Sequence, residues 1–184
     1  MSLAAVLAAI ERAVGEQRYA VIGAVARNAW APPRATTDLD LTISASAETL
    51  EAIEASLRAI GYRRVRQQQA DPSEQLPDIV IFRSKEPTLR QVDLLIAKTD
   101  FEEEVLRRAV RVEIASHAAP VATPEDLVVY KLLADRPRDR DDVRAILRTQ
   151  ARAARPIDWE YVERWAIFWR ISDRLRALRE QPVG

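Results

Sequence analysis

Two aspartates, Asp38 and Asp40, stand two positions apart in the run D-L-D-L-T-I, which begins with strict alternation of acidic and apolar residues. This alternation is typical of a β-strand, in which residues two apart point to the same face. The two carboxylates would therefore stand side by side, with Leu39 and Leu41 buried on the other face. Carboxylates held so close repel each other, and a divalent cation relieves that repulsion. Because oxygen ligands suit Mg²⁺ or Mn²⁺, the pair predicts a metal site.

A third aspartate, Asp93, is the only charged residue inside the largely apolar run Q-V-D-L-L-I. A carboxylate in such a run is costly unless it has a partner or a ligand. Taken alone, Asp93 could pair with a nearby arginine such as Arg90, at the edge of a strand. With Asp38 and Asp40 in the same domain we favour the ligand, and we expect the three carboxylates to share metal ions.

Residues ahead of the aspartate pair have types that bind anions. Gly23 follows the apolar run 19–22, where a strand turns into a helix and backbone N–H groups can meet phosphate. Arg34 and Thr36 follow the helix and could contact an anion with their side chains. This stretch therefore combines a predicted metal site with predicted phosphate contacts.

The stretch 19–43 resembles the signature of the DNA polymerase β-like nucleotidyltransferase superfamily, which is a glycine with a small residue, a short helix, and R-x-T-x-D-x-D. The resemblance is closest to the minimal bacterial branch that includes the AbiEii-like abortive-infection toxins. Many members have serine or glycine where Ala24 stands, so a phosphate contact at Ala24 would come from its backbone. The superfamily carries a third carboxylate on a later strand, which Asp93 resembles. The matching residues of the signature are Gly23, Ala24, Arg34, Thr36, Asp38 and Asp40.

A second segment, E-D-L-V-V-Y-K-L-L-A-D-R-P-R-D-R-D-D-V, resembles the second signature of the minimal nucleotidyltransferases. There, a lysine in one helix precedes R-D-x-x-D at the next, matched here by Lys131, Arg138, Asp139 and Asp142. The resemblance implies that Lys131 contacts phosphate and that Asp139 has a polar role at the site. The residues alone leave other interpretations open, because Lys131 could be a surface lysine and the two aspartates could cap the second helix.

The elements that must position these residues follow from hydrophobic periodicity and from helix and turn signals. Helices are predicted over residues 2–14, 24–31, 47–60, 101–109, 124–135 and 139–153, with a last helical region after Asp158. Strands are predicted over 19–22, 38–43, 62–68, 78–82, 89–97 and 110–114, with His117 in a turn and a short strand near Val121. Residues 69–77 are predicted to form a loop.

The resemblance implies an α+β fold, in which a mixed β-sheet like the palm of polymerase β carries flanking helices. We expect a nucleotidyltransferase core over residues 1–122 and a C-terminal helical section over 123–184 that completes the site. The 28 basic residues equal the 28 acidic ones, so net charge gives no argument for nucleic-acid binding. An arginine stripe along the helix 139–153 and just beyond its end is interpreted either as a solvated face or as a path for RNA or nucleotide phosphate; it comprises Arg140, Arg144, Arg148, Arg152 and Arg155.

Composition excludes several other chemistries. The chain has no cysteine, which excludes disulfides and thiol catalysis, and its single histidine excludes a histidine-rich metal site. No signal peptide or membrane span is expected, so we predict a cytoplasmic protein.

The function implied is Mg²⁺- or Mn²⁺-dependent transfer of a nucleoside monophosphate from an NTP to a hydroxyl acceptor. The acceptor stays open between a tRNA end, a protein and a small molecule. Two alternatives also stay open: a nucleotide-binding or regulatory module that has lost turnover, and a toxin silenced by a partner protein.

Overall fold

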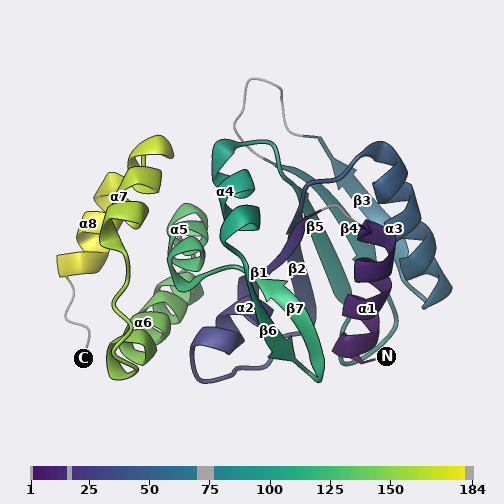
Figure 1. The fold of residues 1–184 in the computed structure, drawn as a ribbon, viewed down its shortest axis with the longest axis horizontal. Helices are drawn as coiled ribbons and strands as arrows, with labels where there is room; N and C mark the ends of the chain where they lie inside the picture. Colours follow the sequence, from purple (N-terminus) through teal and green to yellow (C-terminus); the bar gives the residue numbers. More distant parts are fainter. Residues whose placement is uncertain (1, 16–17, 70–76, 181–184) are drawn as a thin grey trace. The chain divides into compact units, whose positions relative to one another are not determined.

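The computed structural model describes residues 2–15, 18–69 and 77–180, and Figure 1 shows its ribbon. Its helices are α1 (Leu3–Val14), α2 (Gly23–Trp30), α3 (Ala47–Ala59), α4 (Asp100–Arg108), α5 (Pro124–Ala134), α6 (Pro137–Arg152), α7 (Trp159–Phe168) and α8 (Ser172–Glu180). Its strands are β1 (Tyr19–Ile22), β2 (Asp38–Ile43), β3 (Arg63–Gln68), β4 (Asp78–Arg83), β5 (Gln91–Ile96), β6 (Val110–Ile114) and β7 (His117–Val121). The fold is α+β, as the sequence predicts.

One sheet contains the seven strands in the order β3-β4-β5-β2-β1-β7-β6. The pairs β2–β5 and β1–β7 are parallel and the other pairs are antiparallel, so the expected mixed sheet is confirmed. Strand β2 lies in the middle of the sheet, with β1 on one side and β5 on the other. The strand that carries the aspartate pair is therefore held by hydrogen bonds along both of its edges.

The chain divides into two compact units. Unit 1 comprises residues 1–25 and 35–122, and unit 2 comprises residues 26–34 and 123–184. Residue 122 ends the second segment of unit 1 and Thr123 begins the second segment of unit 2, and the expected division into a nucleotidyltransferase core and a helical section that completes the site stays a prediction. The short segment 26–34 instead groups with the C-terminal helices, although its neighbours in the chain belong to unit 1.

Unit 1 has a continuous apolar core built from helices α1 and α3 and one side of the sheet. Both helices begin at a serine that caps them, Ser2 for α1 and Ser46 for α3. Each helix buries the apolar face that its periodicity predicts. The residues that are fully inaccessible to solvent include Leu7, Ile10, Ile53 and Leu57 from the helices and Leu39, Leu41, Val92 and Leu94 from the strands.

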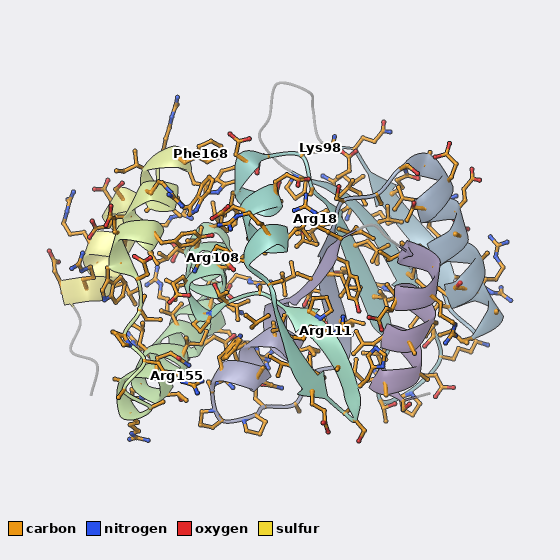
Figure 2. All side chains as sticks on the ribbon, viewed as in Figure 1. Arg18, Lys98, Arg108, Arg111, Arg155 and Phe168 are labelled. Carbon is orange, nitrogen blue, oxygen red and sulfur yellow. The ribbon has the colours of Figure 1, made fainter. Side chains whose placement is uncertain are left out.

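Unit 2 is a helical layer of α5, α6, α7 and α8. Helix α5 begins with a capping box, in which the Thr123 side chain accepts from the Asp126 backbone and the Asp126 carboxylate accepts from Thr123. Edge-to-face aromatic contacts run along α7. Phe168, labelled in Figure 2, makes such a contact with Trp165, with ring centroids 5.3 Å apart. Among the described residues, no helix has the length and hydropathy of a membrane span.

Two local expectations differ from the structure, and a third is not tested. His117 is the first residue of β7 rather than part of a turn, and its Nε2 lies 2.9 Å from Glu11 Oε2 on α1. The last helical region is two helices, because Arg170 adopts a left-handed conformation with φ 56° between them. Most of the loop expected over 69–77 lies outside the described residues.

Candidate active site

Strand β2 places its two aspartates on one face of the sheet. Leu39 and Leu41 are fully buried, while Asp38 is exposed and Asp40 is half-buried. In the parallel pairing of β2 with β5, Asp40 lies directly opposite Asp93. Residues opposite each other on neighbouring strands point to the same side and lie about 4.8 Å apart. Asp38, Asp40 and Asp93 therefore share one face of unit 1.

The Asp93 carboxylate is only partly satisfied by its surroundings. Its Oδ2 accepts a hydrogen bond of 3.0 Å from Gln91 Nε2, while its Oδ1 is buried without a hydrogen-bond partner in the described structure. Burial raises the pKa of Asp93 and the nearby charge of Asp38 raises it further, against the opposing effect of the Gln91 hydrogen bond. The fold thus makes the ionised form of Asp93 costly, and a cation at the free oxygen would offset that cost.

Gly23 stands directly against the Asp40 carboxylate. It has φ +64°, and a Cβ added there would lie 2.0 Å from Asp40 Oδ2. Only glycine fits, because a side chain would both strain the backbone and overlap the carboxylate. Gly23 also begins α2, so Asp40 lies at a helix N-terminus, where a negative charge is favoured. Ala24, the next residue, is half-buried in the first turn of the same helix.

The threonines before β2 hold the start of the strand. The Thr36 hydroxyl accepts from the Asp38 backbone N–H at 3.2 Å and lies 3.2 Å from the Asp38 carbonyl oxygen. Thr37 Oγ1 donates to Asp38 Oδ1 over 3.1 Å. Thr36 therefore fixes the backbone at Asp38, and its expected contact with phosphate stays a prediction.

The carboxylate face matches a hard divalent cation in its donor chemistry. Three carboxylates share the face, one buried oxygen of Asp93 has no hydrogen-bond partner in the described structure, and carboxylate oxygens are ligands that suit Mg²⁺ or Mn²⁺. Among the described residues, however, no group of three or more His, Asp or Glu side chains is already arranged closely enough to hold a metal ion. Since Mg²⁺ is commonly held by one or two carboxylates together with substrate phosphates and water, the residues fit such an ion. They do not form a preformed cage.

Unit 2 contains a buried ionic cluster centred on Asp142 of α6. Arg34 binds the Asp142 carboxylate with two hydrogen bonds, from Nε at 2.9 Å and from Nη2 at 2.8 Å. Lys131 of α5 donates to Asp142 Oδ2 at 2.8 Å, and Arg27 Nε lies 3.1 Å from Oδ1. This geometry attaches both ends of the 26–34 segment to α6.

Asp139 extends the cluster by one turn of α6. It accepts from Lys131 Nζ at 2.8 Å and from Arg136 Nε at 2.6 Å. Four cationic side chains thus surround two carboxylates, which leaves a surplus of positive charge in the cluster. Lys131 is almost fully buried, so it is not the snorkelling surface lysine that was one interpretation of the sequence.

The pairing outweighs the burial of both aspartates in the cluster. Burial by itself would raise the pKa of Asp142, but the hydrogen bonds from Arg34 and Lys131 lower it to about 2. The hydrogen bonds from Arg136 and Lys131 likewise lower the pKa of Asp139 against the effect of burial. Both carboxylates are held as anions over the whole ordinary pH range.

The nine expected site residues thus fall into two groups. Unit 1 brings together Gly23, Ala24, Thr36, Asp38, Asp40 and Asp93, and unit 2 brings together Arg34, Lys131 and Asp139. The other three members of the unit 2 cluster, Arg27, Arg136 and Asp142, were not among the expected site residues. Asp142 was already part of the second signature, whereas Arg27 offered only the signal of a charge in a short, largely apolar helix.

Comparison with known proteins gives one family match and a set of similar folds. The family described as "Nucleotidyl transferase AbiEii toxin, Type IV TA system" matches residues 5–158. No curated protein matches the chain. A crystal structure of ANT(2″)-Ia in complex with adenylyl-2″-tobramycin has a TM-score of 0.55 at 18% identity, with 90% of this chain and 92% of that chain covered. The nucleotidyltransferase toxin MenT4 from Mycobacterium tuberculosis H37Rv has a TM-score of 0.50 at 17% identity, with 88% and 59% covered.

Proposed function

Because the chain belongs to the AbiEii nucleotidyltransferase family, we propose that it transfers a nucleoside monophosphate from an NTP to a hydroxyl acceptor in a reaction that depends on Mg²⁺ or Mn²⁺. The observation that carries the proposal is the arrangement on the unit 1 face. Asp40 and Asp93 lie opposite each other there, and Asp93 keeps a buried oxygen without a hydrogen-bond partner in the described structure. A carboxylate face of this kind is stabilised by the cations that phosphoryl transfer needs.

The proposed reaction is a direct displacement at phosphorus. The acceptor oxygen forms a bond to the α-phosphorus, and the bond from that phosphorus to the oxygen bridging to the β-phosphate breaks. Pyrophosphate leaves with the electron pair of the broken bond. Divalent ions held by Asp38, Asp40 and Asp93 would supply charge that stabilises the attacking and leaving oxygens. Asp93 is also the proposed base for the hydroxyl proton, because its buried Oδ1 has no hydrogen-bond partner in the described structure.

The remaining site residues are proposed to bind the phosphate groups of the nucleotide or to orient the residues that bind them. Gly23 and Ala24 would offer backbone N–H groups at the start of α2. Arg34 and Lys131 would contribute from the unit 2 cluster, whose positive charge exceeds its negative charge. Asp139 is proposed to orient Lys131 rather than to contact the nucleotide, since it already accepts a hydrogen bond from Lys131.

The acceptor is the open part of the proposal. ANT(2″)-Ia was solved with an adenylylated small molecule, tobramycin, whereas MenT4 is a nucleotidyltransferase toxin. The family description places its members in toxin–antitoxin systems, so we include a partner protein that silences the activity. A nucleotide-binding module without turnover is the second candidate, favoured by Ala24, which has no hydroxyl to offer a phosphate.

The test is a screen with radiolabelled NTPs, Mg²⁺ or Mn²⁺ and cell extract, comparing the parent protein with Asp38→Asn. We expect the substitution to lower transfer by more than roughly 100-fold, because it removes a metal-binding charge at nearly constant volume. The matched control is Asp173→Asn on α8, whose side chain is 91% exposed and which should transfer like the parent.

The two candidate functions give different outcomes in that screen. Labelled product that is lost in Asp38→Asn and kept in Asp173→Asn supports the enzyme. A parent protein that binds NTP but labels no acceptor supports the module without turnover. If the parent neither binds NTP nor transfers a nucleotide, both candidates are wrong.

A further inference from the structure

In the described part of the chain, the sheet of unit 1 has β3 and β6 at its edges, and the two edges differ. The unpaired backbone groups of an edge strand can pair with another chain, and folded proteins block this with like charges and bulges. β3 has both features, since R-R-V-R-Q-Q carries three arginines and its register is irregular between Arg64 and Arg66. β6, with the sequence V-R-V-E-I, has one charge of each sign and a regular register. Of the two edges, β6 is therefore the unprotected one.

The tight hairpin of β6 and β7 determines which backbone groups of β6 point away from β7. The two strands are joined by the turn 115–116, whose residues have φ 50° and 66°, and Ile114 pairs with His117 across it. In a turn of this kind the backbone N–H of His117 donates to the carbonyl of Ile114. Hydrogen bonding then alternates along the antiparallel pair, so the N–H and C=O groups of Arg111 and Glu113 point outward.

Two observations agree with outward-pointing backbone groups at Arg111 and Glu113. Pro120 lies opposite Arg111 and has no N–H, so these two residues cannot exchange the two hydrogen bonds of a bonded pair. In the described structure, no backbone hydrogen bond from outside the β6–β7 pair reaches Arg111 or Glu113. Both side chains are exposed, so a further strand has room to add to the sheet at β6.

The sequence of β6 is complementary to itself when a second copy runs antiparallel to it. A two-fold axis perpendicular to the sheet must pass through one residue, because paired residues point to the same side. An axis at Arg111 or at Glu113 would place like charges opposite each other. An axis at Val112 pairs all five residues of β6 and places Arg111 of each copy opposite Glu113 of the other. It also places Val110 opposite Ile114.

We propose that β6 pairs with β6 of a second copy of this chain, antiparallel and centred on Val112, so that two sheets join into one. Two pairs of Arg111 with Glu113 then flank the axis on one side of the joined sheet. Val110, Val112 and Ile114 form pairs of β-branched residues on the other side. Both kinds of cross-strand pair stabilise antiparallel strands. This surface is separate from the carboxylate face and does not depend on the proposed function.

Arg111, labelled in Figure 2, already has partners within its own chain. Its Nη2 donates to Glu11 Oε1 at 3.0 Å and to the carbonyl oxygen of Ala118 at 2.6 Å. The side chain is nevertheless 61% exposed, and an exposed ion pair contributes little stability. Glu11 is also shared with His117, whose Nε2 lies 2.9 Å from Glu11 Oε2. Glu113 makes no ion pair among the described residues, so it is the carboxylate that gains a partner on pairing.

The paired surface is small, which sets the strength to expect. Five residues of a strand extend over about 17 Å. A contact of this size is at the lower end of specific interfaces, so the dimer should be weak and should form with rising protein concentration between about 10 µM and 1 mM.

The test is sedimentation equilibrium of the full chain over that range, comparing the parent with Glu113→Arg and Arg111→Glu. Each variant alone places like charges opposite each other at two positions, so dimerisation should weaken by more than about 30-fold. An equimolar mixture of the two variants should dimerise again, because each arginine then faces a glutamate of the other chain. The control Asp173→Arg makes the same kind of charge change on α8, where the side chain is 91% exposed, and should dimerise like the parent.

A second variant tests the backbone rather than the charges. Glu113→Pro removes an outward N–H that β7 does not use, so it should abolish dimerisation while the far-UV circular dichroism and Tm stay those of the parent. Loss of the dimer in the single variants and recovery in the mixture support the pairing. A parent that stays at 20.8 kDa over the whole range overturns it. A dimer that survives both Glu113→Arg and Glu113→Pro also overturns it, as does a mixture of folded variants that fails to recover.

Discussion

Asp93 in unit 1 is half-buried and Asp142 in unit 2 is buried, and folding moves their pKa values in opposite directions. Burial raises the pKa of Asp93, and its one hydrogen bond comes from a neutral amide. Asp142 is nearly inaccessible to solvent, but contacts with Arg27, Arg34 and Lys131 lower its pKa to about 2. The charges around each carboxylate, rather than how deeply it is buried, therefore decide whether its pKa is raised or lowered.

The difference separates a structural carboxylate from one that needs a ligand. Removing a partner from a buried ion pair is strongly destabilising, so the Asp142 cluster holds unit 2 together and orders the 26–34 segment. The unit 1 face keeps a carboxylate whose charge the protein itself does not neutralise. A cation that binds there would neutralise this charge and stabilise unit 1, as expected of a binding site.

The largest effect is expected from Asp142→Ala. The substitution leaves Lys131 and two arginines without their shared anion, which should cost about 3–5 kcal/mol of unfolding free energy. The measurement is urea unfolding followed by tryptophan fluorescence, because all four tryptophans lie in unit 2. Asp141→Ala, one residue away and with a side chain 77% exposed, is the control and should change little. Equal stability of the two variants would show that the cluster does not hold unit 2 together.

Gly23→Ala tests how unit 1 positions Asp40. The added Cβ would lie 2.9 Å even from the Asp40 Cβ, so rotation of the carboxylate cannot remove the overlap and the backbone must shift. We expect the free energy of unfolding to fall by up to about 3 kcal/mol and transfer activity to be lost.

Gly15→Ala is the matched control, since Gly15 has φ +61° but open space around it. Gly15→Ala should cost only the roughly 1–2 kcal/mol of backbone strain and should retain activity. If both variants retain activity, the contact between Gly23 and Asp40 does not position the carboxylate.

Local patterns in the sequence predicted much of this structure. Period-two alternation placed Asp38 and Asp40 opposite Leu39 and Leu41, because a strand buried on one side fixes which residues face the core. Asp158 marked a helix start, because the backbone N–H that its side chain satisfies, that of Tyr161, lies within the first turn. The pairing of Asp40 with Asp93 could not be derived from the spacing, because strand order depends on contacts between distant segments.

In the unit 2 cluster, too, local patterns in the sequence could not predict which side chains would contact one another. Periodicity placed Lys131 on a half-buried helix but did not distinguish a surface lysine from one buried between two carboxylates. That distinction depends on Asp139 and Asp142, which belong to the next helix, and on Arg27 and Arg34, about a hundred residues earlier. The grouping of 26–34 with the C-terminal helices follows from these distant ion pairs, and no local signal marks it.

An acid titration sharpens the contrast for Asp142. Its pKa is near 3.8 in the unfolded chain and about 2 in the fold, so the fold favours the anion. The resulting stabilisation is complete above pH 4 and is lost as the pH falls from about 4 to 2; a shift of this size corresponds to about 2 kcal/mol. Tryptophan-detected unfolding at several pH values should show this loss in the parent and not in Asp142→Asn. The same slope in both proteins would assign the acid sensitivity to other groups.

The smallest effect is expected from Asp93→Asn, and its sign is opposite. A raised pKa means that the fold disfavours the anion, so the stability contributed by this group falls as the pH rises above its unfolded value near 3.8. At pH 7 without metal, Asp93→Asn should therefore stabilise unit 1 by about 1 kcal/mol or less, since part of the side chain meets water. Hydrogen exchange of the β5 amides reports this change locally.

Asp78→Asn on β4 is the control: its carboxylate pairs with Lys98 at 2.6 Å, so the substitution should give no gain in stability. Added Mg²⁺ should slow β5 exchange more in the parent than in Asp93→Asn, because the variant keeps only Asp38 and Asp40 of the three proposed ligands and lacks the one on β5. A destabilised Asp93→Asn that responds to Mg²⁺ as the parent does would show that the Asp93 carboxylate is satisfied within the fold and is not a metal ligand.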